Sequence, residues 1–219
     1  MINYIDVINN KKLEIYMKKG NDLLGVLGFT DHSSEHTAKV ACNAAKILTD
    51  FGHDERTVEL SKIAGYMHDI GNVVNRAQHS LTGATLAFQI LSEMDMEPSE
   101  IADIISAIGN HDEGVGEPVN TIAAAIIIAD KSDVRRSRVR NENNLTFDIH
   151  DRVNYAVEKT EIETNVEKKE ITLKLSIDVS ICPVIDYFEI FLTRMIMCKK
   201  AAEFLQAKFK LIINGAEIL

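Results

Sequence analysis

Six polar side chains in this sequence stand where the surrounding pattern predicts apolar contacts. They are four histidines and two aspartates: His36, His68, Asp69, His79, His111 and Asp130. Imidazole nitrogens and carboxylate oxygens can ligate a metal ion or carry a proton during catalysis. Taken singly, each histidine could be a hydrogen-bonded core residue, and Asp130 could be a helix cap or a salt-bridge partner. Taken together they are too many buried polar groups for hydrogen bonding alone.

A metal centre inside the protein would satisfy all six groups at once. Imidazole and carboxylate ligands without cysteine suit transition metals better than Ca²⁺, Mg²⁺ or a structural zinc site. We expect two divalent transition-metal ions, with Fe or Mn preferred and Zn, Co or Ni as alternatives. Two ions would lie roughly 3.5–4 Å apart, and Asp69 could bridge them because a carboxylate has two oxygens. Such a centre retains positive charge and could bind an anionic substrate.

Helical segments must position these ligands. Apolar residues recur at three- and four-residue intervals along most of the chain, which is typical of amphipathic helices. His36 begins an inward stripe, and Asp130 ends TIAAAIIIAD, which is apolar on all sides and predicts a central buried helix. His68 and Asp69 precede Gly71, which we expect to end their helix. The predicted helices are roughly 6–18, 33–51, 56–70, 80–94, 99–110, 119–133 and 148–159.

The tail after Thr160 follows a different pattern. Apolar residues alternate with polar ones from Ile171 to Val179, which predicts a half-buried strand. Pro183 precedes a long helical stripe, and the segment from Phe209 to Ile213 predicts a short final strand. The fold class is therefore mainly α: a helical bundle over residues 1–160, and a small β-α-β appendage over 161–219 that packs on it. This tail could cover the pocket, select the substrate or form a homodimer contact.

The composition and net charge of the chain limit the classes of partner that it is expected to bind. The chain has 219 residues and a net charge of −9, which disfavours binding to a nucleic-acid polymer or an anionic membrane. We found no signal peptide and no long apolar run, so we expect a cytoplasmic protein. The three cysteines, Cys42, Cys182 and Cys198, lack metal-ligand spacing and are expected to fill the core as reduced thiols.

The ligand pattern resembles a known family. The order His36, His68-Asp69 and Asp130 on successive helices is similar to the H…HD…D signature of the HD superfamily of metal-dependent phosphohydrolases. HSLTGA at 79–84 resembles the HPxxGA element of HD enzymes with two metals, and His111 stands where their next ligand falls. The resemblance covers roughly residues 30 to 140. It implies the HD-domain fold, metal cofactors and a phosphoester or phosphoanhydride substrate.

Two further segments resemble particular HD enzymes. NHDEGVGEP at 110–118 looks like a shortened HHExxDGxGYP motif of the HD-GYP phosphodiesterases of cyclic-di-GMP, with Asn110 and Glu117 as departures. ADKSDVRRSR at 129–138 is similar to the ADxIxPxR of bacterial diadenosine tetraphosphate hydrolases, without its proline. The expected substrate is thus a small phosphorylated compound, in the first place a nucleotide.

In such an enzyme a metal-bound hydroxide attacks phosphorus. We predict catalytic roles for His68, Asp69 and Lys131, and phosphate contacts for Lys131, Arg135 and Arg138. The alternative for the arginines is a solvated basic face.

Other polar residues and other functions stay open. Asp112 and Asp133 could orient a ligand imidazole, whereas His32, His53 and His150 lie in polar segments and are expected at the surface. Two rival functions remain: a di-iron oxygenase on the same fold, and a nucleotide-sensing module without catalysis.

Overall fold

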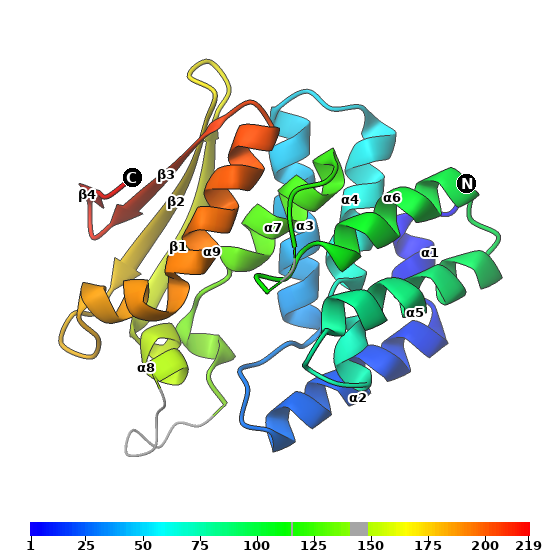
Figure 1. Cartoon of the computed structure of the whole chain (residues 1–219), viewed down its shortest axis with the longest axis horizontal. Coiled ribbons are helices and arrows are strands. Elements are labelled where there is room, and N and C mark those ends of the chain that lie inside the picture. Colours follow the sequence, from blue (N-terminus) through cyan, green and yellow to red (C-terminus); the bar gives the residue numbers. More distant parts are fainter. Residues whose placement is uncertain (115, 141–148) are drawn as a thin grey trace.

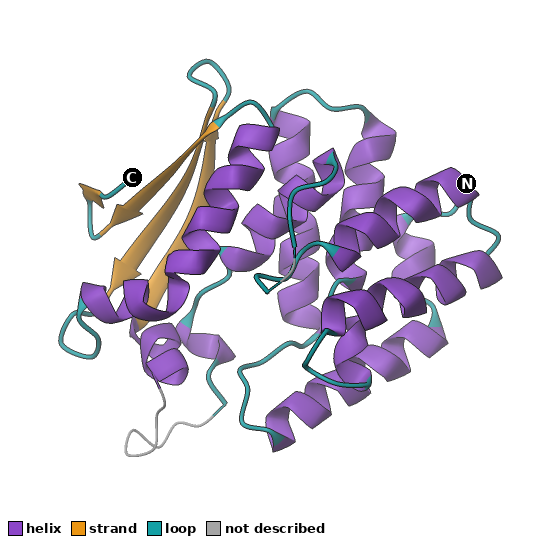
Figure 2. Ribbon diagram, viewed as in Figure 1, coloured by secondary structure: helices purple, strands orange, loops and turns teal. Residues whose placement is uncertain are grey.

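Helices form the first part of the chain and a small sheet follows them, as predicted (Figures 1 and 2). The structure is a computed structural model that describes residues 1–114, 116–140 and 149–219. The helical part contains α1 (Tyr4–Ile8), α2 (Lys11–Val26), α3 (Ser34–Asp50), α4 (Glu55–Met67), η1 (Ile70–Val73), α5 (His79–Glu93), α6 (Pro98–Gly109), α7 (Thr121–Lys131), η2 (Arg136–Arg138) and α8 (Ile149–Ala156). The tail contains β1 (Val157–Asn165), β2 (Glu170–Ile177), α9 (Val184–Phe204), β3 (Lys208–Ile213) and β4 (Ala216–Glu217). Within the described ranges, none of the helices combines the length and apolar character that a membrane span requires.

Helix α7 forms the centre of the bundle. Every residue from Ile122 to Ala129 is buried, as its all-round apolar sequence predicts. The side chain of Asn120 caps the helix by accepting a hydrogen bond from the Ala123 amide at 2.7 Å. The helix packs against α3, α4 and α6 on one side and against α9 on the other. Its last turn therefore delivers Asp130 and Lys131 to the middle of the molecule.

Two helix predictions were wrong in detail. The segment predicted as one helix over 6–18 is two helices, because the Asn10 side chain accepts the Lys12 and Leu13 amides and starts α2 afresh. The helix predicted over 148–159 ends at Ala156, and Val157 already belongs to β1; residue 148 lies outside the described residues. After the buried Val157, the inward side chains of β1 are Thr160, Ile162 and Thr164, so the strand has little apolar alternation to reveal it.

The sheet joins a hairpin to a parallel crossover. Strands follow the order β1-β2-β3-β4; β1 and β2 are antiparallel, β2 and β3 parallel, and β3 and β4 antiparallel. The predicted β-α-β unit is thus β2-α9-β3. Alternate residues of β2 and β3, such as Leu173 and Leu211, are buried, and α9 packs against β3 and α7 (Figure 1). Because α9 contacts both β3 and α7, the tail reaches the middle of the bundle.

The cysteines do not all fill the core. Cys182 and Cys198 are buried, but Cys42 is exposed, so the prediction was wrong for Cys42. Its neighbour Ala41 faces inward, and the next residue of a helix points about 100° away.

Gly71 allows a close approach of backbones and does not end a helix, which corrects the sequence prediction. Helix α4 already ends at Met67, and Gly71 lies inside η1. A Cβ atom on Gly71 would lie 1.9 Å from the carbonyl oxygen of His79 and 2.6 Å from the amide nitrogen of Gly83. Both are backbone atoms of α5, which cannot move aside as a flexible side chain can. This contact holds the start of α5 against the segment that follows Asp69.

We predict that Gly71→Ala destabilises the protein by about 1–3 kcal/mol or more, because the added methyl forces η1 and α5 apart. Thermal unfolding measures this, since each kcal/mol corresponds to about 2–4 °C in a chain of this size. Gly109→Ala is the matched control: its Cβ would meet only Ala84 Cβ, at 3.7 Å. Equal melting temperatures for Gly71→Ala and Gly109→Ala would contradict the close-packing role.

Candidate metal centre

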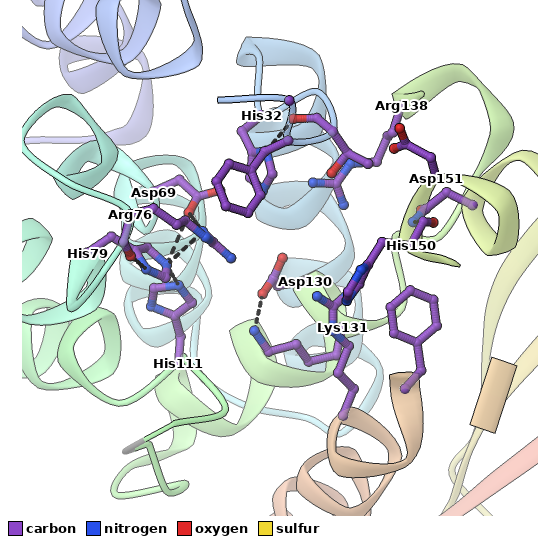
Figure 3. Close-up of a pocket in the computed structure, with 16 residues that line it drawn as sticks. His32, Asp69, Arg76, His79, His111, Asp130, Lys131, Arg138, His150 and Asp151 are labelled. Carbon is purple, nitrogen blue, oxygen red and sulfur yellow. Dashed lines mark hydrogen bonds and ion pairs between the residues drawn. The ribbon is translucent and has the colours of Figure 1, made fainter. Parts of the chain in front are cut away.

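The six predicted ligands converge in one cluster between the helices. His36 comes from α3, His68 and Asp69 from the link between α4 and η1, His79 from the first residue of α5, His111 from the residues after α6, and Asp130 from the last turn of α7. All are buried except Asp130, which is half-buried. Figure 3 shows Asp69, His79 and His111 grouped together, with Asp130 facing them across a cavity. The six residues therefore meet as the helical pattern predicted.

Each of the four imidazoles is fixed through its Nδ1 atom. The Nδ1 atoms of His68, His79 and His111 lie 2.7, 3.1 and 2.6 Å from the carbonyl oxygens of Gly65, Arg76 and Ile108. That of His36 lies 2.8 Å from Asp133 Oδ2. An Nδ1 that donates to oxygen leaves the lone pair of the ring on Nε2, the arrangement found in metal-ligating histidines. The structure thus turns four Nε2 atoms toward one space.

Asp69 lies between two sets of imidazoles. Its Oδ2 atom is 3.2 Å from His68 Nε2 and 3.7 Å from His36 Nε2. Its Oδ1 atom is 3.4 Å from His79 Nε2, which is itself 3.1 Å from His111 Nε2. Asp130 Oδ1 completes the first set, at 3.3 Å from His36 Nε2 and 3.6 Å from His68 Nε2. The two oxygens of Asp69 therefore face different groups of nitrogen donors.

Several of these atoms have no hydrogen-bond partner. Among the described residues, His36 Nε2, His68 Nε2 and Asp69 Oδ2 are fully buried and have ion-pair contacts but no hydrogen-bond partner. Native proteins rarely leave buried polar atoms unsatisfied, so a shared cluster of them calls for a missing partner. Single donor atoms of His36, His68 and Asp130, and likewise of His68, Asp69 and His111, lie within 4.8 Å of one another. The donor types and their convergence fit divalent metal ions.

The electrostatics of the cluster favour a cation. Burial opposes the charged form of His68, but the carboxylates of Asp69 and Asp130 outweigh it and raise the pKa of this imidazole to about 10. Burial also opposes the charge of Asp69, yet the neighbouring His68 and His32 hold the pKa of its carboxyl well below the usual range. The carboxylates thus stay negative and attract positive charge. Burial lowers the pKa of His111 well below its ordinary value, so this ring is neutral and free to ligate.

Asp133 orients His36, as the sequence analysis considered. It is fully buried and also contacts Lys39 Nζ at 2.7 Å and Arg135 Nε at 3.0 Å. Burial opposes its charge, but its contacts with His36, Arg138 and Lys39 lower the pKa of its carboxyl far below the usual range. Asp112 does not orient His111 in this way, because His111 Nδ1 contacts the Ile108 carbonyl instead.

Asn72 and Arg76 support the other side of Asp69, and the sequence reading missed both. The Asn72 side chain donates to Asp69 Oδ1 at 2.8 Å. One Arg76 nitrogen lies 3.7 Å from Asp69 Oδ1 and 3.3 Å from His79 Nε2. Their positions, three after Asp69 and three before His79, put them within one turn of a ligand, and this spacing could have identified them.

A cavity of ≈290 Å³ opens onto the cluster. Asp69, His79, His111 and Asp130 line one part of it (Figure 3). Lys131 also lines it, with its Nζ 2.7 Å from Asp130 Oδ2 and 3.3 Å from Glu113 Oε2. Burial lowers the pKa of this ammonium, but Asp130 and Glu113 outweigh that effect and raise it. Lys131 is therefore a charged group at the edge of the histidine and aspartate cluster.

The predicted phosphate-binding arginines occupy different places. Arg138 lines the cavity, whereas Arg135 is not among its lining residues. The Arg135 guanidinium instead donates to Asp133 and, at 2.6 Å, to Glu35 Oε1. Arg135 thus supports the carboxylate behind His36.

Residues outside the predicted site also line the cavity. His32, expected at the surface, packs edge-on against His36 with ring centroids 5.6 Å apart. His150, although exposed, and Asn154 line it from α8, and Phe191 and Arg194 line it from α9. Arg194 interrupts the apolar run FLTRMIMC, and a cation inside such a run was the signal that could have revealed it. The tail thus forms part of the cavity wall.

Comparisons with known proteins agree with this site. A family profile described as "HD domain" matches residues 34–135, which include all six predicted ligands. The uncharacterized protein MJ1020 of Methanocaldococcus jannaschii is 29% identical over 188 residues, covering 75% of this chain and 72% of that protein. Ribonuclease Y of Bacillus subtilis is 27% identical over 128 residues, 55% of this chain but only 23% of that enzyme.

A solved structure shows a more distant likeness. It is that of a predicted HD superfamily hydrolase from an uncultured Thermotogales bacterium, with 22% identity and a TM-score of 0.45, covering 57% of this chain and 68% of that one. The assignment does not depend on it. The profile match and the H…HD…D residues that it spans identify residues 34–135, slightly less than half of the chain, as an HD domain.

Proposed function

We propose that this protein is a metal-dependent phosphohydrolase that cleaves a phosphoester or phosphoanhydride of a nucleotide or related small molecule. The observation that supports this most strongly is the position of Asp69. One of its oxygens faces His36 and His68, and the other faces His79. A carboxylate between two groups of imidazoles suits a centre of two metal ions, which is a common arrangement in enzymes that act on phosphate.

The residues divide into two ligand groups around Asp69. His36, His68, Asp69 and Asp130 would hold one ion, and Asp69, His79 and His111 would hold the second. Divalent ions supply Lewis-acid chemistry and lower the pKa of a water that attacks phosphorus. Mixed imidazole and carboxylate ligands make Fe or Mn our first choice, with Zn, Co or Ni as alternatives.

The protein's own groups would bind and orient the substrate. Lys131 holds the outer oxygen of Asp130 and presents positive charge to the cavity. Arg138 has Nε and Nη1 fixed by the carbonyls of Asp31 and Asp133, both at 2.9 Å, so its guanidinium is held in one orientation at the wall. Cations fixed in this way can neutralise and position a phosphate without reorganising.

A small substrate fits the site better than a polymer. The relatives named ribonuclease Y act, by their name, on RNA, which supports phosphoester chemistry. The matched part is only 23% of their length, however, and this chain has a net charge of −9. The cavity of ≈290 Å³ lies at the small end of the range for ligand pockets.

The proposed function predicts both the metal content and the reaction of the protein. Elemental analysis of the purified protein should find transition metal at one to two ions per chain. The metal-loaded protein should hydrolyse members of a panel of nucleotides, dinucleoside polyphosphates and cyclic dinucleotides, with the nucleotide products separated by chromatography and free phosphate measured alongside, and EDTA should remove this activity. An oxygen electrode should register no uptake during turnover. Oxygen consumption with no hydrolysis product, or tight nucleotide binding with no turnover, would reject the hydrolase.

The second prediction concerns the histidine and aspartate at the centre. His68→Ala and Asp69→Asn should each lower bound metal below one ion per chain and reduce turnover by at least about 10³-fold, because they remove a ligand that both the metal and the reaction need. His53→Ala, a histidine away from the cluster, should keep full metal content and activity. Normal activity in either ligand variant would rule out the proposed centre.

The third prediction concerns Asp133. Asp133→Asn should weaken metal affinity about 10- to 100-fold, because the group that orients His36 loses its charge. Titration with Co²⁺, followed by visible absorption, measures this directly in the folded protein. The matched variant Asp112→Asn removes a carboxylate next to His111 that does not hold an imidazole, and should change affinity less than about threefold. Equal effects from the two variants would show that Asp133 does not act through His36.

A further inference from the structure

Arg194 brings a positive charge from the tail into the cavity. It lies on α9, outside the residues 34–135 that match the HD domain, and it lines the same cavity as the metal cluster. Lys131, at the edge of the ligand cluster, and Arg194 contact the two oxygens of the same carboxylate, Glu113. The proposed metal centre gives no reason for this positive charge of Arg194 in the cavity, which indicates another role.

The guanidinium of Arg194 is held on two sides. Its Nε atom lies 2.5 Å from Glu113 Oε1, and its Cζ atom lies 4.4 Å from the centre of the Phe191 ring. Phe191 is itself buried, so the ring is a fixed platform. Among the described residues, no hydrogen-bond partner is present for the two terminal nitrogens of Arg194. These nitrogens form an oriented pair of donors, of the kind that recognises phosphate or carboxylate.

Arg138 adds a second cation to the same space. It is buried and lines the cavity. Its Nη1 atom lies 3.9 Å from Asp133 Oδ2, and its Nε and Nη1 donate to backbone carbonyls, so the guanidinium is fixed at the cavity wall. Arg138 and Arg194 therefore bring two positive charges, from two different parts of the chain, to one cavity. Glu113 contacts Arg194 and shares its other oxygen with Lys131. An anion bound in the cavity could interact with both guanidinium groups.

We propose that Arg194 and Arg138 form a second anion subsite, so that the substrate carries a second anionic oxygen group besides the phosphate that reacts. This inference rests on the proposed function and narrows its substrate class. A compound with two phosphates, or with a phosphate and a carboxylate, would place one group at the metal cluster and the other between the arginines. The cavity of ≈290 Å³ limits such a compound to a small molecule.

Binding of phosphonates that cannot be hydrolysed tests the subsite without relying on turnover. Three probes are titrated by calorimetry into the metal-loaded protein at a fixed concentration of free Mn²⁺. Methylphosphonate carries one anionic group, methylenediphosphonate carries two phosphonates, and phosphonoacetate carries a phosphonate and a carboxylate. We expect at least one of the two double anions to bind the wild-type protein about tenfold or more tightly than methylphosphonate. Arg194→Ala should lower the affinity for one double anion more than for the other. That probe shows whether the second group is phosphate-like or a carboxylate.

The variants separate the role of Arg194 from a general effect on the fold. Arg194→Ala should lower the affinity for the preferred double anion about tenfold and the affinity for methylphosphonate less than twofold. The affinity of Arg194→Lys for the double anion should lie between those of Arg194→Ala and the wild-type protein, because a lysine keeps the charge but not the paired donors. Lys199→Ala removes an exposed cation from the same helix and should change nothing. Equal weakening of all three probes by Arg194→Ala, or no weakening at all, would overturn the proposal.

The outcome also distinguishes this inference from the proposed function. If the wild-type protein hydrolyses phosphoesters but Arg194→Ala does not discriminate between the probes, the subsite is wrong and the hydrolase stands. If the probes are discriminated but no phosphoester is hydrolysed, the anion subsite stands and the hydrolase fails.

Discussion

Two carboxylates, those of Asp69 and Asp130, lie inside a helical bundle where little water can solvate them. Burial of negative charge is costly unless cations lie nearby. Removing one partner of a buried ion pair destabilises the fold strongly, because the other charge stays buried without compensation. The imidazoles of His36 and His68 and the ammonium of Lys131 supply part of the compensation. Buried atoms in the described cluster still have no hydrogen-bond partner, however, so divalent metal ions would complete the site best.

The bundle is built so that backbones fix these side chains. Three imidazoles are tied to carbonyl oxygens near their own helix ends, which makes the direction of each ring a consequence of where its helix starts or stops. Gly71 lets α5 approach the segment after Asp69, and this brings His79 to the other oxygen of that carboxylate. Helix α7 carries Asp130 into the centre because its other residues are apolar. The contacts that pack the helices together are therefore the same contacts that fix the directions of the histidine and aspartate side chains.

The convergence of the six residues was predictable from sequence because its signals are local. Each of these residues stands on or next to a helix whose apolar period shows which side faces inward, and the central position of α7 follows from its composition. Strand β1 was not predictable in this way, since its inward positions after Val157 hold two threonines and one isoleucine. The surroundings of the site were also hidden. Arg194 meets Glu113 across 81 residues of chain, and Arg135 and Arg138 have similar sequence contexts but different neighbours. Only the packing of distant segments decides such contacts.

An anomalous-scattering experiment on crystals of the metal-loaded protein tests the central claim most directly. Data collected on both sides of the absorption edge of the metal found by elemental analysis should show peaks between the Nε2 atoms of the four histidines and the oxygens of Asp69 and Asp130. Ligand distances of about 2.0–2.2 Å are expected for such atoms around a transition metal. A map without an anomalous peak in this cluster, or with the four imidazoles turned away from one another, would contradict the account.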